Sequence, residues 1–304
     1  MTIKEILADI RSDRVKKVIL DCDAYNDIDD EYAIAFAVGS EKMNVLSVNA
    51  ALFNNPRVKG YEDGMIHSYN QIKKVLKLIG AEDIPVYEGC PTTVTLSDGA
   101  PVSSPAVDNI IKTAHESDEI VYILATGAST NVASAIMTDP SIKDNICVIW
   151  LACNTLDYSS AGDYNVGQDE AAGKYMLNCG VNLMILPAIG PEGYGTQTII
   201  GDQEYLDKMI KGDSEAAVFF RNYLPDFAFA EEGEPLHHFW DIAAPGVLEV
   251  PEAFDLSIVM APRIRLDNTW AFEDGRHDIM YMSRLDDKKL MDATFEIIGK
   301  VCLK

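Results

Sequence analysis

Apolar strand-like runs alternate with helical patterns along the first two thirds of this 304-residue chain. Strands are expected at residues 17–21, 44–51, 84–87, 120–126, 146–152 and 182–186, and helices at 30–38, 58–79, 106–115, 131–137 and 170–179. Strands that are joined by crossover helices pair in parallel and build a sheet with helices on both faces. The alternation therefore predicts an α/β fold with a doubly wound, mostly parallel sheet.

The last third of the chain is less regular, with helices expected at 202–210, 216–223, 236–247 and 288–301 and an acidic turn at 231–235. Two further strands, 256–260 and 278–282, are expected at the edge of the sheet, where antiparallel pairing is common. No stretch has the composition of a linker, and a chain of this length can bury a large core. Residues 1–304 are therefore predicted to form a single large domain with a few antiparallel edge strands.

Five aspartates crowd the end of the first predicted strand, after the apolar run Val18-Ile19-Leu20; they are Asp21, Asp23, Asp27, Asp29 and Asp30. Neighbouring carboxylates repel one another, so such a group either spreads into solvent or surrounds a cation. Oxygen ligands without a Cys or His pattern favour calcium or magnesium over zinc. The alternative is that Asp29 and Asp30 cap the following helix and the others form a solvated loop.

The net charge of the chain limits its partners. Lys and Arg total 25 against 48 Asp and Glu, which gives a net charge of -23. This charge excludes a nucleic-acid backbone or an anionic membrane as the expected partner. The N-terminal segment carries charges throughout, no apolar run is long enough to span a bilayer, and the six cysteines are scattered. We expect a cytosolic (cytoplasmic) protein without structural disulfides.

Polar residues recur at the ends of the predicted strands. Asn54 follows the second strand, Thr126 ends the strand at 120–126, and the loop 154–165 follows the strand at 146–152. The carboxyl ends of parallel strands lie at one edge of a sheet, and ligands bind there at the point where the strand order reverses. These residues and the acidic loop are therefore expected to converge on one site.

The acidic stretch resembles the N-terminal signature of the nucleoside hydrolase family, calcium-dependent enzymes that cleave the N-glycosidic bond of ribonucleosides. The family motif has the form D-x-D-P-G-x-D-D, and this chain has Asp21-Cys-Asp23-Ala-Tyr-Asn-Asp27-Ile-Asp29-Asp30. Two extra residues, Tyr25 and Asn26, intervene and the Pro-Gly pair is absent. The resemblance implies a nucleoside hydrolase-like fold with a Rossmann-like core.

Later motifs resemble the family's other calcium-binding segments. Residues 125–131 resemble the T-G-x-L-T-N turn, and Trp240-Asp241 resembles the H-D pair. The resemblance implies that Ca²⁺ is held by the side chains of Asp23, Asp30 and Asp241 and by the backbone carbonyl of Thr126. It further implies that Asp23 is the catalytic residue, which takes a proton from a metal-bound water.

The implied substrate-binding residues are Asp29, Asn54, Asp157, Asp163, Asn165, Leu151 and Trp240. Asp163-Tyr164-Asn165 resembles the family's E-F-N segment, which holds ribose hydroxyls, and Leu151 takes the place of a Met beneath the sugar. Trp240 replaces the His that protonates the leaving base in the family. The indole could instead stack on a purine or belong to the core, and His237 or His238, just upstream, is an alternative acid.

The resemblance implies a ribonucleoside hydrolase of purine or pyrimidine salvage that binds a small molecule and forms a homodimer or homotetramer. Two alternatives keep the same site, namely another ribosyl or sugar substrate and a non-catalytic sugar-binding relative. The segment I-L-D-C-D also resembles haloacid dehalogenase phosphatases, but Ala24-Tyr25-Asn26 lacks the Thr or Val that follows there. An EF-hand is excluded because the loop has no Gly at position six and no Glu at twelve.

Overall fold

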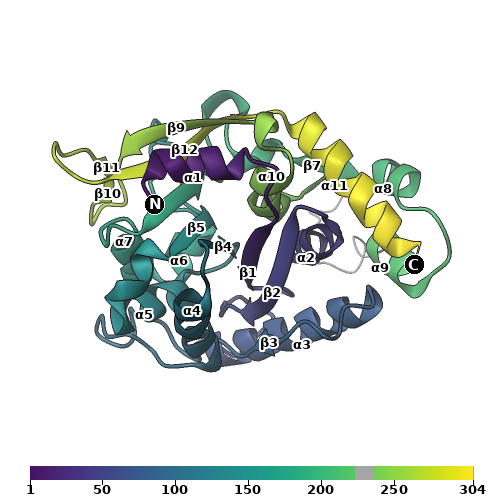
Figure 1. Ribbon diagram of the computed structural model, residues 1–304, viewed down its shortest axis with the longest axis horizontal. Coiled ribbons are helices and arrows are strands. Elements are labelled where there is room, and N and C mark those ends of the chain that lie inside the picture. Colours follow the sequence, from purple (N-terminus) through teal and green to yellow (C-terminus); the bar gives the residue numbers. More distant parts are fainter. Residues whose placement is uncertain (223–235, 304) are drawn as a thin grey trace.

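The structure, a computed structural model, describes residues 1–222 and 236–303 and is built on an eight-stranded sheet with the strand order β3-β2-β1-β4-β5-β6-β12-β9 (Figure 1). The strands are β1 (Lys16–Cys22), β2 (Met43–Ala50), β3 (Val86–Tyr87), β4 (Val121–Ala125), β5 (Ile146–Leu151), β6 (Asn182–Leu186), β9 (Phe254–Met260) and β12 (Asp278–Leu285). Every pairing in this sheet is parallel except that of β9 with β12. The predicted doubly wound, mostly parallel sheet is confirmed.

The central strands are buried along their whole length. All residues of β4 and β5 are buried, and in β1 only Lys17 is partly exposed. A strand that is covered on both faces has no polar side to alternate with, which explains the continuous apolar runs at Val18-Ile19-Leu20 and in β4 and β5.

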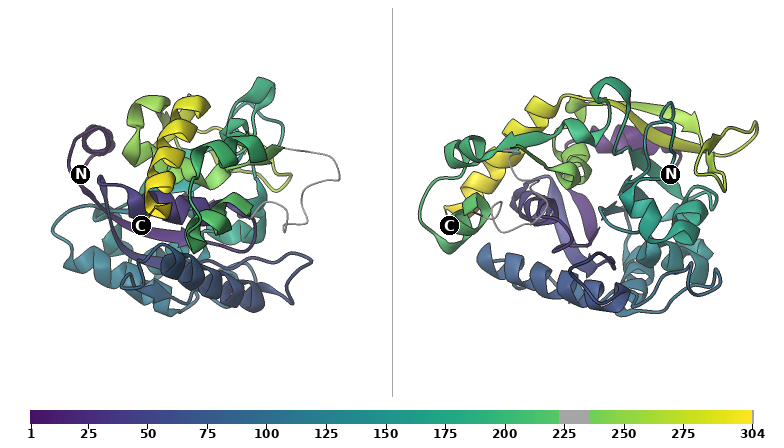
Figure 2. Two further views of the ribbon diagram at one scale, coloured as in Figure 1. Left: turned by 90° about the vertical axis from the view of Figure 1, so that its right-hand side faces the viewer. Right: turned by 180° about the vertical axis from the view of Figure 1, so that it is seen from behind.

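Two helical layers cover the sheet (Figures 1 and 2). One layer contains α2 (Asp29–Gly39), α3 (Tyr61–Leu78), α10 (Ala243–Glu249) and α11 (Asp287–Cys302), and the other contains α4 (Pro105–Glu116), α5 (Thr130–Thr138) and α7 (Glu170–Met176). The helix α1 (Ile3–Ile10) packs against β12. α2 is buried on nearly all sides, because α3, α10 and α11 surround it on the sheet.

The remaining elements lie outside the main sheet; they are α6 (Tyr164–Gln168), α8 (Gln203–Met209), α9 (Glu215–Asn222), the antiparallel pair β7 (Ile200–Asp202) and β8 (Leu236–His238), and the hairpin β10 (Arg263–Ile264) and β11 (Trp270–Ala271). None of the helices in the described part of the chain combines the length and the apolar character that a bilayer crossing requires. All six cysteines are free thiols.

Two expectations about the last third differ from the structure. The helix predicted at 236–247 is instead β8, a 3-10 turn over Trp240–Ile242, and the short helix α10. The backbone at 236–238 pairs with β7, and this pairing overrides the helical pattern of the sequence. The strand predicted at 278–282 is β12, which lies inside the sheet rather than at its edge. The predicted turn at 231–235 lies outside the described residues.

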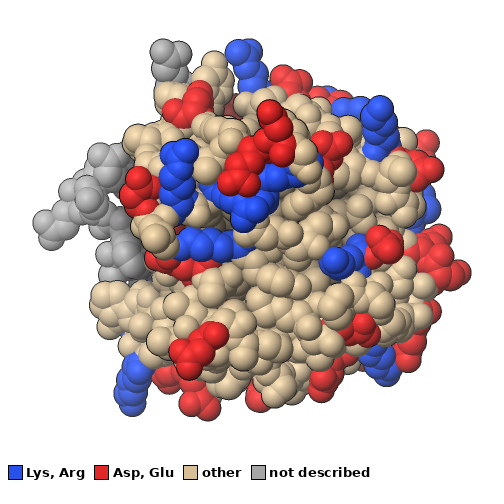
Figure 3. Space-filling view, turned by 90° about the vertical axis from the view of Figure 1, so that its left-hand side faces the viewer, with Lys and Arg blue, Asp and Glu red and all other residues tan. Residues whose placement is uncertain are grey.

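Charged side chains of both signs are interspersed on the face of the molecule that Figure 3 shows. Figure 3 shows Lys and Arg next to Asp and Glu on the face that carries α4 to α7, with uncharged surface between them. On this face the excess of acidic residues therefore leaves no large basic patch.

Asn131 in α5 forms hydrogen bonds to β1, to β2 and to the loop after β3. Its Nδ2 donates to Asp21 Oδ2 at 3.1 Å and to the carbonyl of Ala50 at 3.1 Å, and its Oδ1 accepts from the backbone N–H of Cys90 at 2.8 Å. We predict that Asn131→Ala lowers the free energy of unfolding by about 2–4 kcal/mol, because buried polar partners lose their hydrogen bonds. Urea unfolding measures the change, and Asn178→Ala, at an exposed asparagine, is the control with an expected loss under about 0.5 kcal/mol. Equal losses for the two variants would contradict the prediction.

Candidate functional site

A cavity of about 360 Å³ opens at the carboxyl ends of the strands, beside β1 and β4, where the strand order reverses. It is lined by Asp23, Asn26, Asp27, Asp29, Asp30, Thr126, Leu151, Asn154, Gly162, Asp163, Tyr164, Asn165, Ala188, Ile189, Trp240 and Asp241. The volume is within the range of small-molecule sites, roughly 300–1,000 Å³. The structure thus brings together every predicted site residue except Asn54 and Asp157.

Four carboxylates from three segments of the chain are buried at this cavity. Asp23 follows β1, Asp29 and Asp30 begin α2, and Asp241 lies in the turn Trp240–Ile242. Each is at most 5% exposed. The N-cap of α2 is Ile28, without a side-chain capping bond, so Asp29 and Asp30 occupy the first turn rather than the cap position.

Hydrogen bonds from neighbouring groups hold these carboxylates in place. Thr126 Oγ1 donates to Asp30 Oδ1 at 2.7 Å. The backbone N–H of Asp241 donates to Asp29 Oδ2 at 3.0 Å, across 212 residues of sequence. Asn26 Nδ2 donates to Asp23 Oδ2 at 2.9 Å. The bonds to Asp29 and Asp30 come from distant segments of the chain, so the fold holds these two carboxylates. Asn26 is three residues from Asp23 and holds it within a local turn.

The cluster carries uncompensated negative charge. Burial raises the pKa of Asp23 well above its ordinary value, and the charge of Asp30 raises it further. The pKa values of Asp29 and Asp241 are also raised well above the ordinary value, first by burial and then by neighbouring aspartates. Burial raises the pKa of Asp30 to about 6, although the hydrogen bond from Thr126 lowers it. No Lys or Arg is among the described residues that line the cavity.

The donor chemistry of the cluster fits a hard divalent cation, because every donor is an oxygen and the charge lacks a counter-ion. Within residues 1–222 and 236–303, however, no group of three or more His, Cys, Asp or Glu side chains is placed so that it could hold a metal ion. The side chains of the buried aspartates would therefore have to turn before they could hold an ion together. The calcium site at Asp23, Asp30, Thr126 and Asp241 stays a prediction.

Asn165 links the ends of two central strands. Its Nδ2 donates to the carbonyls of Thr126, at 2.7 Å, and Leu151, at 2.9 Å, which follow β4 and end β5 respectively. The resemblance implies that the Thr126 carbonyl binds calcium and that Asn165 binds ribose. In the structure the Asn165 amide donates to this carbonyl. This contact fixes the floor of the cavity.

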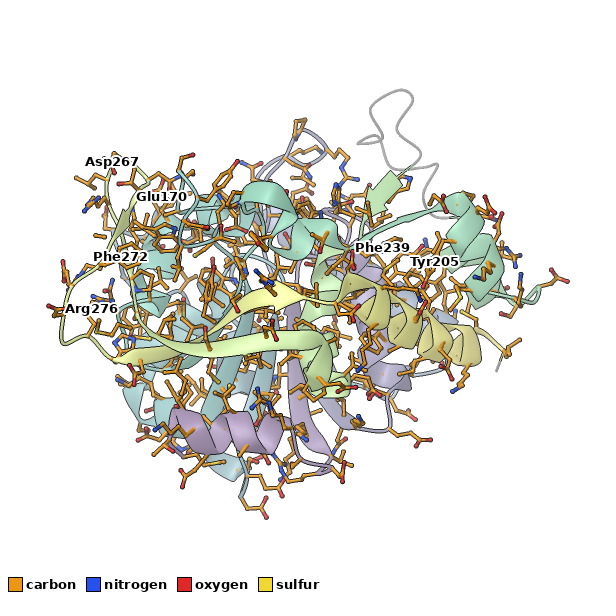
Figure 4. The ribbon with its side chains drawn as sticks, turned by 90° about the horizontal axis from the view of Figure 1, so that it is seen from above. Glu170, Tyr205, Phe239, Asp267, Phe272 and Arg276 are labelled. Atoms are coloured by element: carbon orange, nitrogen blue, oxygen red, sulfur yellow. The ribbon has the colours of Figure 1, made fainter. Side chains whose placement is uncertain are left out.

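Asp163 lines the cavity and is the N-cap of α6. Its Oδ1 accepts from the backbone N–H groups of Cys153, at 2.9 Å, and Val166, at 3.1 Å, while burial raises its pKa. The preceding loop is held by Asn268 at the turn of the β10–β11 hairpin, which accepts from the N–H groups of Ala161 and Gly162. In Figure 4 the hairpin residue Asp267 lies at the same end of the molecule as Glu170 of α7.

Trp240 lines the cavity and is half-buried, so it does not belong to the core. Its ring stacks on that of His238, with ring centroids 4.6 Å apart and an interplanar angle of 28°. Neither His237 nor His238 is among the residues that line the cavity. The aromatic pair therefore presents an indole to the cavity.

Two predicted residues lie away from the cavity. Asn54 is exposed, and its backbone N–H and carbonyl are bound by the side chain of Gln168. Asp157 is exposed on the loop after β5. Neither side chain lines the cavity.

The sequence analysis missed several lining residues, among them Asn26, Asn154 and Tyr164. Asn154 follows directly after β5, so its position at a strand end was an available signal. Its Nδ2 donates to the carbonyls of Ser160 and Gly162 and thereby closes the loop beneath Asp163. No sequence signal distinguished Tyr164 from its neighbours in the E-F-N-like segment.

We predict that Asp30→Asn stabilises the metal-free protein at high pH. Burial raises the pKa of Asp30 from its ordinary value of 3.8 to about 6 in the folded protein. Ionisation of this carboxylate therefore destabilises the fold, and this effect is absent below about pH 4 and complete above pH 6. The free energy of unfolding of the variant should therefore be about 1–3 kcal/mol higher than that of the wild type at pH 8.

Urea unfolding in a chelator at pH 8 and pH 4 measures this gain, which should vanish at the lower pH. Asp213→Asn, at an exposed aspartate, is the matched control and should change neither value. A variant that is less stable than the wild type at pH 8 would show that ionisation of the buried Asp30 does not destabilise the fold.

The family model described as inosine-uridine preferring nucleoside hydrolase matches residues 18–269 of this chain. The chain is 24% identical over 248 residues to the pyrimidine-specific ribonucleoside hydrolase RihA of Escherichia coli O1:K1, covering 72% of this chain and 76% of that protein. It is 26% identical over 192 residues to the RihA of Citrobacter koseri, covering 55% and 58%.

Solved structures show the same fold. A plant nucleoside hydrolase, PpNRh1, superposes with a TM-score of 0.76 at 19% identity, covering 94% of this chain and 99% of that one. The purine-preferring ribonucleoside hydrolase from Gardnerella vaginalis gives a TM-score of 0.72 at 18% identity, with the same coverage of both chains. The common fold extends over nearly the whole chain.

Proposed function

Because this chain belongs to the inosine-uridine preferring nucleoside hydrolase family, we propose that its cavity binds a ribonucleoside beside a calcium ion and that Asp23 is the general base. The chain is a ribonucleoside hydrolase, an N-glycosidase. The observation that carries the mechanistic proposal is the convergence of four buried carboxylates with Asp163 and Asn165 around one cavity.

The calcium ion would be held by Asp23, Asp30, Asp241 and the carbonyl of Thr126, after their side chains turn towards it. When bound, it supplies a positive charge that lowers the pKa of a coordinated water and fixes its approach. It also compensates the charge that now raises the pKa values of the cluster.

In the reaction, Asp23 takes a proton from the attacking water while the water oxygen forms a bond to the anomeric carbon of the ribose. The bond from that carbon to the base nitrogen breaks, and its electron pair stays on the nitrogen. The leaving base gains a proton from solvent, and Asp23 returns to solvent the proton that it took from the water. The products are free base and ribose. The negative cluster also stabilises the positive charge that develops on the sugar ring.

We propose that the carboxylates of Asp29 and Asp163 accept hydrogen bonds from ribose hydroxyls, a role supported by their position in the lining of the cavity. Such a site would reject deoxyribonucleosides because its buried polar groups would be left unpaired. Trp240, which also lines the cavity, would contact the base by aromatic stacking. Asn54 and Asp157 have no role in this proposal. A single domain over 1–304, a homodimer or homotetramer, and a cytosolic location stay predictions.

We predict that the wild type releases free base and ribose from at least one of inosine, guanosine, adenosine, uridine and cytidine in calcium. A chelator should abolish release of the base. It should also lower the melting temperature by roughly 5 °C, because it removes the stabilisation by an ion that binds only the folded protein and is present at a hundred times its Kd. Chromatography of the base and a thermal melt measure the two effects. The absence of release from all five nucleosides in calcium, magnesium or manganese would overturn the activity.

We predict that Asp23→Asn lowers kcat by about 10²–10⁴-fold, because the amide cannot accept the proton of the attacking water. The inactive variant should still bind the nucleoside by calorimetry, which distinguishes a catalytic role from a collapsed site. Asp213→Asn is the control at an exposed carboxylate. If Asp23→Asn kept kcat within threefold of the wild type, another group would be the base.

A further inference from the structure

Tyr25 and Asn26, the two residues inserted in the acidic motif, form a turn beside the cavity, which Asn26 lines. Tyr25 has a φ of 81°, in the left-handed region that costs a non-glycine residue roughly 1–2 kcal/mol. Arg57 Nη2 donates to the carbonyls of both Tyr25 and Asn26. The Tyr25 ring stacks on His67, with centroids 4.6 Å apart, and the Arg57 guanidinium lies 5.2 Å from the ring centroid. The surrounding structure therefore stabilises an unfavourable backbone conformation.

This turn directs the side chain of Asn26 towards Asp23. Asn26 Nδ2 donates to Asp23 Oδ2 at 2.9 Å. Asn26 Oδ1 accepts from Asn55 Nδ2 at 3.0 Å and from the hydroxyl of Tyr164 at 2.9 Å. The Asn26 amide thus connects the end of β1 to the loop after β2 and to Tyr164, which also lines the cavity.

The orientation of the Asn26 amide follows from a donor that cannot be reversed. The backbone N–H of Arg57 donates to Asn55 Oδ1 at 2.9 Å, and a backbone N–H is always a donor. Asn55 must therefore turn its Nδ2 to Asn26, which in turn must present Oδ1 to Asn55 and Nδ2 to Asp23. The hydrogen-bond direction is therefore set by the Arg57 N–H, the third group along the chain of hydrogen bonds from the Asp23 carboxylate.

The other side of the Asp23 carboxylate is confined by Gly127. A Cβ at this glycine would lie 3.0 Å from both Cγ and Oδ1 of Asp23 and 3.1 Å from the Cβ of Ala51. Asp23 therefore has Oδ2 bound by Asn26 and Oδ1 packed against a residue without a side chain. Both contacts restrict the rotation of the carboxylate.

We propose that Asn26 is a positioning residue for Asp23 and that Asn55 sets the direction of its hydrogen bond, an inference that rests on the proposed role of Asp23. Asn26 restricts the orientation of the carboxylate, so that Asp23 samples few rotamers before it meets the ion and the attacking water. Residues that orient a metal ligand commonly account for 10–100-fold in metal affinity or activity.

The test is Asn55→Asp, which keeps the acceptor for the Arg57 N–H but replaces the donor to Asn26 by an oxygen. The single NH2 group of Asn26 then lies between two carboxylates, so its hydrogen bond to Asp23 competes with one to the new carboxylate at position 55. We expect kcat for the best nucleoside to fall about 10–100-fold and calcium binding by calorimetry to weaken about tenfold. Added negative charge alone would tighten cation binding, so the sign of the calcium effect distinguishes the two explanations.

Asn26→Ala should reproduce the loss, and the double variant Asn26→Ala, Asn55→Asp should lose no more than Asn26→Ala alone, since both changes remove the same hydrogen bond. Asn178→Asp adds the same charge at an exposed site and should leave kcat and calcium affinity unchanged. Thermal melts verify that the variants are folded. Unchanged or tighter calcium binding in Asn55→Asp, with kcat within twofold of the wild type, would overturn the proposal.

The outcomes separate this inference from the proposed function. A wild type that binds calcium but cleaves no nucleoside would refute the hydrolase mechanism, and the calcium titrations would still decide the role of Asn26. An active wild type whose Asn55→Asp variant is unaffected would refute only the positioning role. A wild type with neither calcium binding nor turnover would refute both.

Discussion

Repulsion among buried carboxylates is the constraint on which the rest of this structure depends. Asp23, Asp29, Asp30 and Asp241 are withdrawn from water at one cavity with raised pKa values. A large apolar core offsets this cost, because β4 and β5 are buried throughout and α2 is enclosed by three other helices. The site is thus an unfavourable arrangement that the surrounding fold maintains, as expected where binding of a cation supplies the missing charge.

Much of the fold could be predicted because buried parallel strands leave a strong pattern. The apolar runs that became β1, β4 and β5 have no polar face, and the helices α3 and α4 between them have the periodicity of one buried and one exposed side. The same logic located the cavity, since Asp23, Thr126 and the loop 154–165 come at strand ends that a parallel sheet brings to one edge. Their grouping is a consequence of topology and needed no knowledge of side-chain contacts.

The rest could not be predicted because it depends on loop conformation and on distant partners. Asn54 follows a strand as Asp23 does, yet its loop points the side chain away from the cavity and binds its backbone to Gln168. The segment 236–238 has a helical pattern but pairs with β7. The role of Asn26 depends on Asn55 and Tyr164, which are 29 and 138 residues away in sequence.

The hydrogen bond between Asp241 and Asp29 spans 212 residues, and it joins an early helix to a late turn. The cavity therefore has no precursor in any short piece of the chain. During synthesis on the ribosome, a chain that has emerged only as far as β6 has the parallel strands β1 to β6 but lacks Trp240 and Asp241 of the site. A metal or nucleoside that binds only the completed cavity would thus stabilise finished chains and give no help to those still being made.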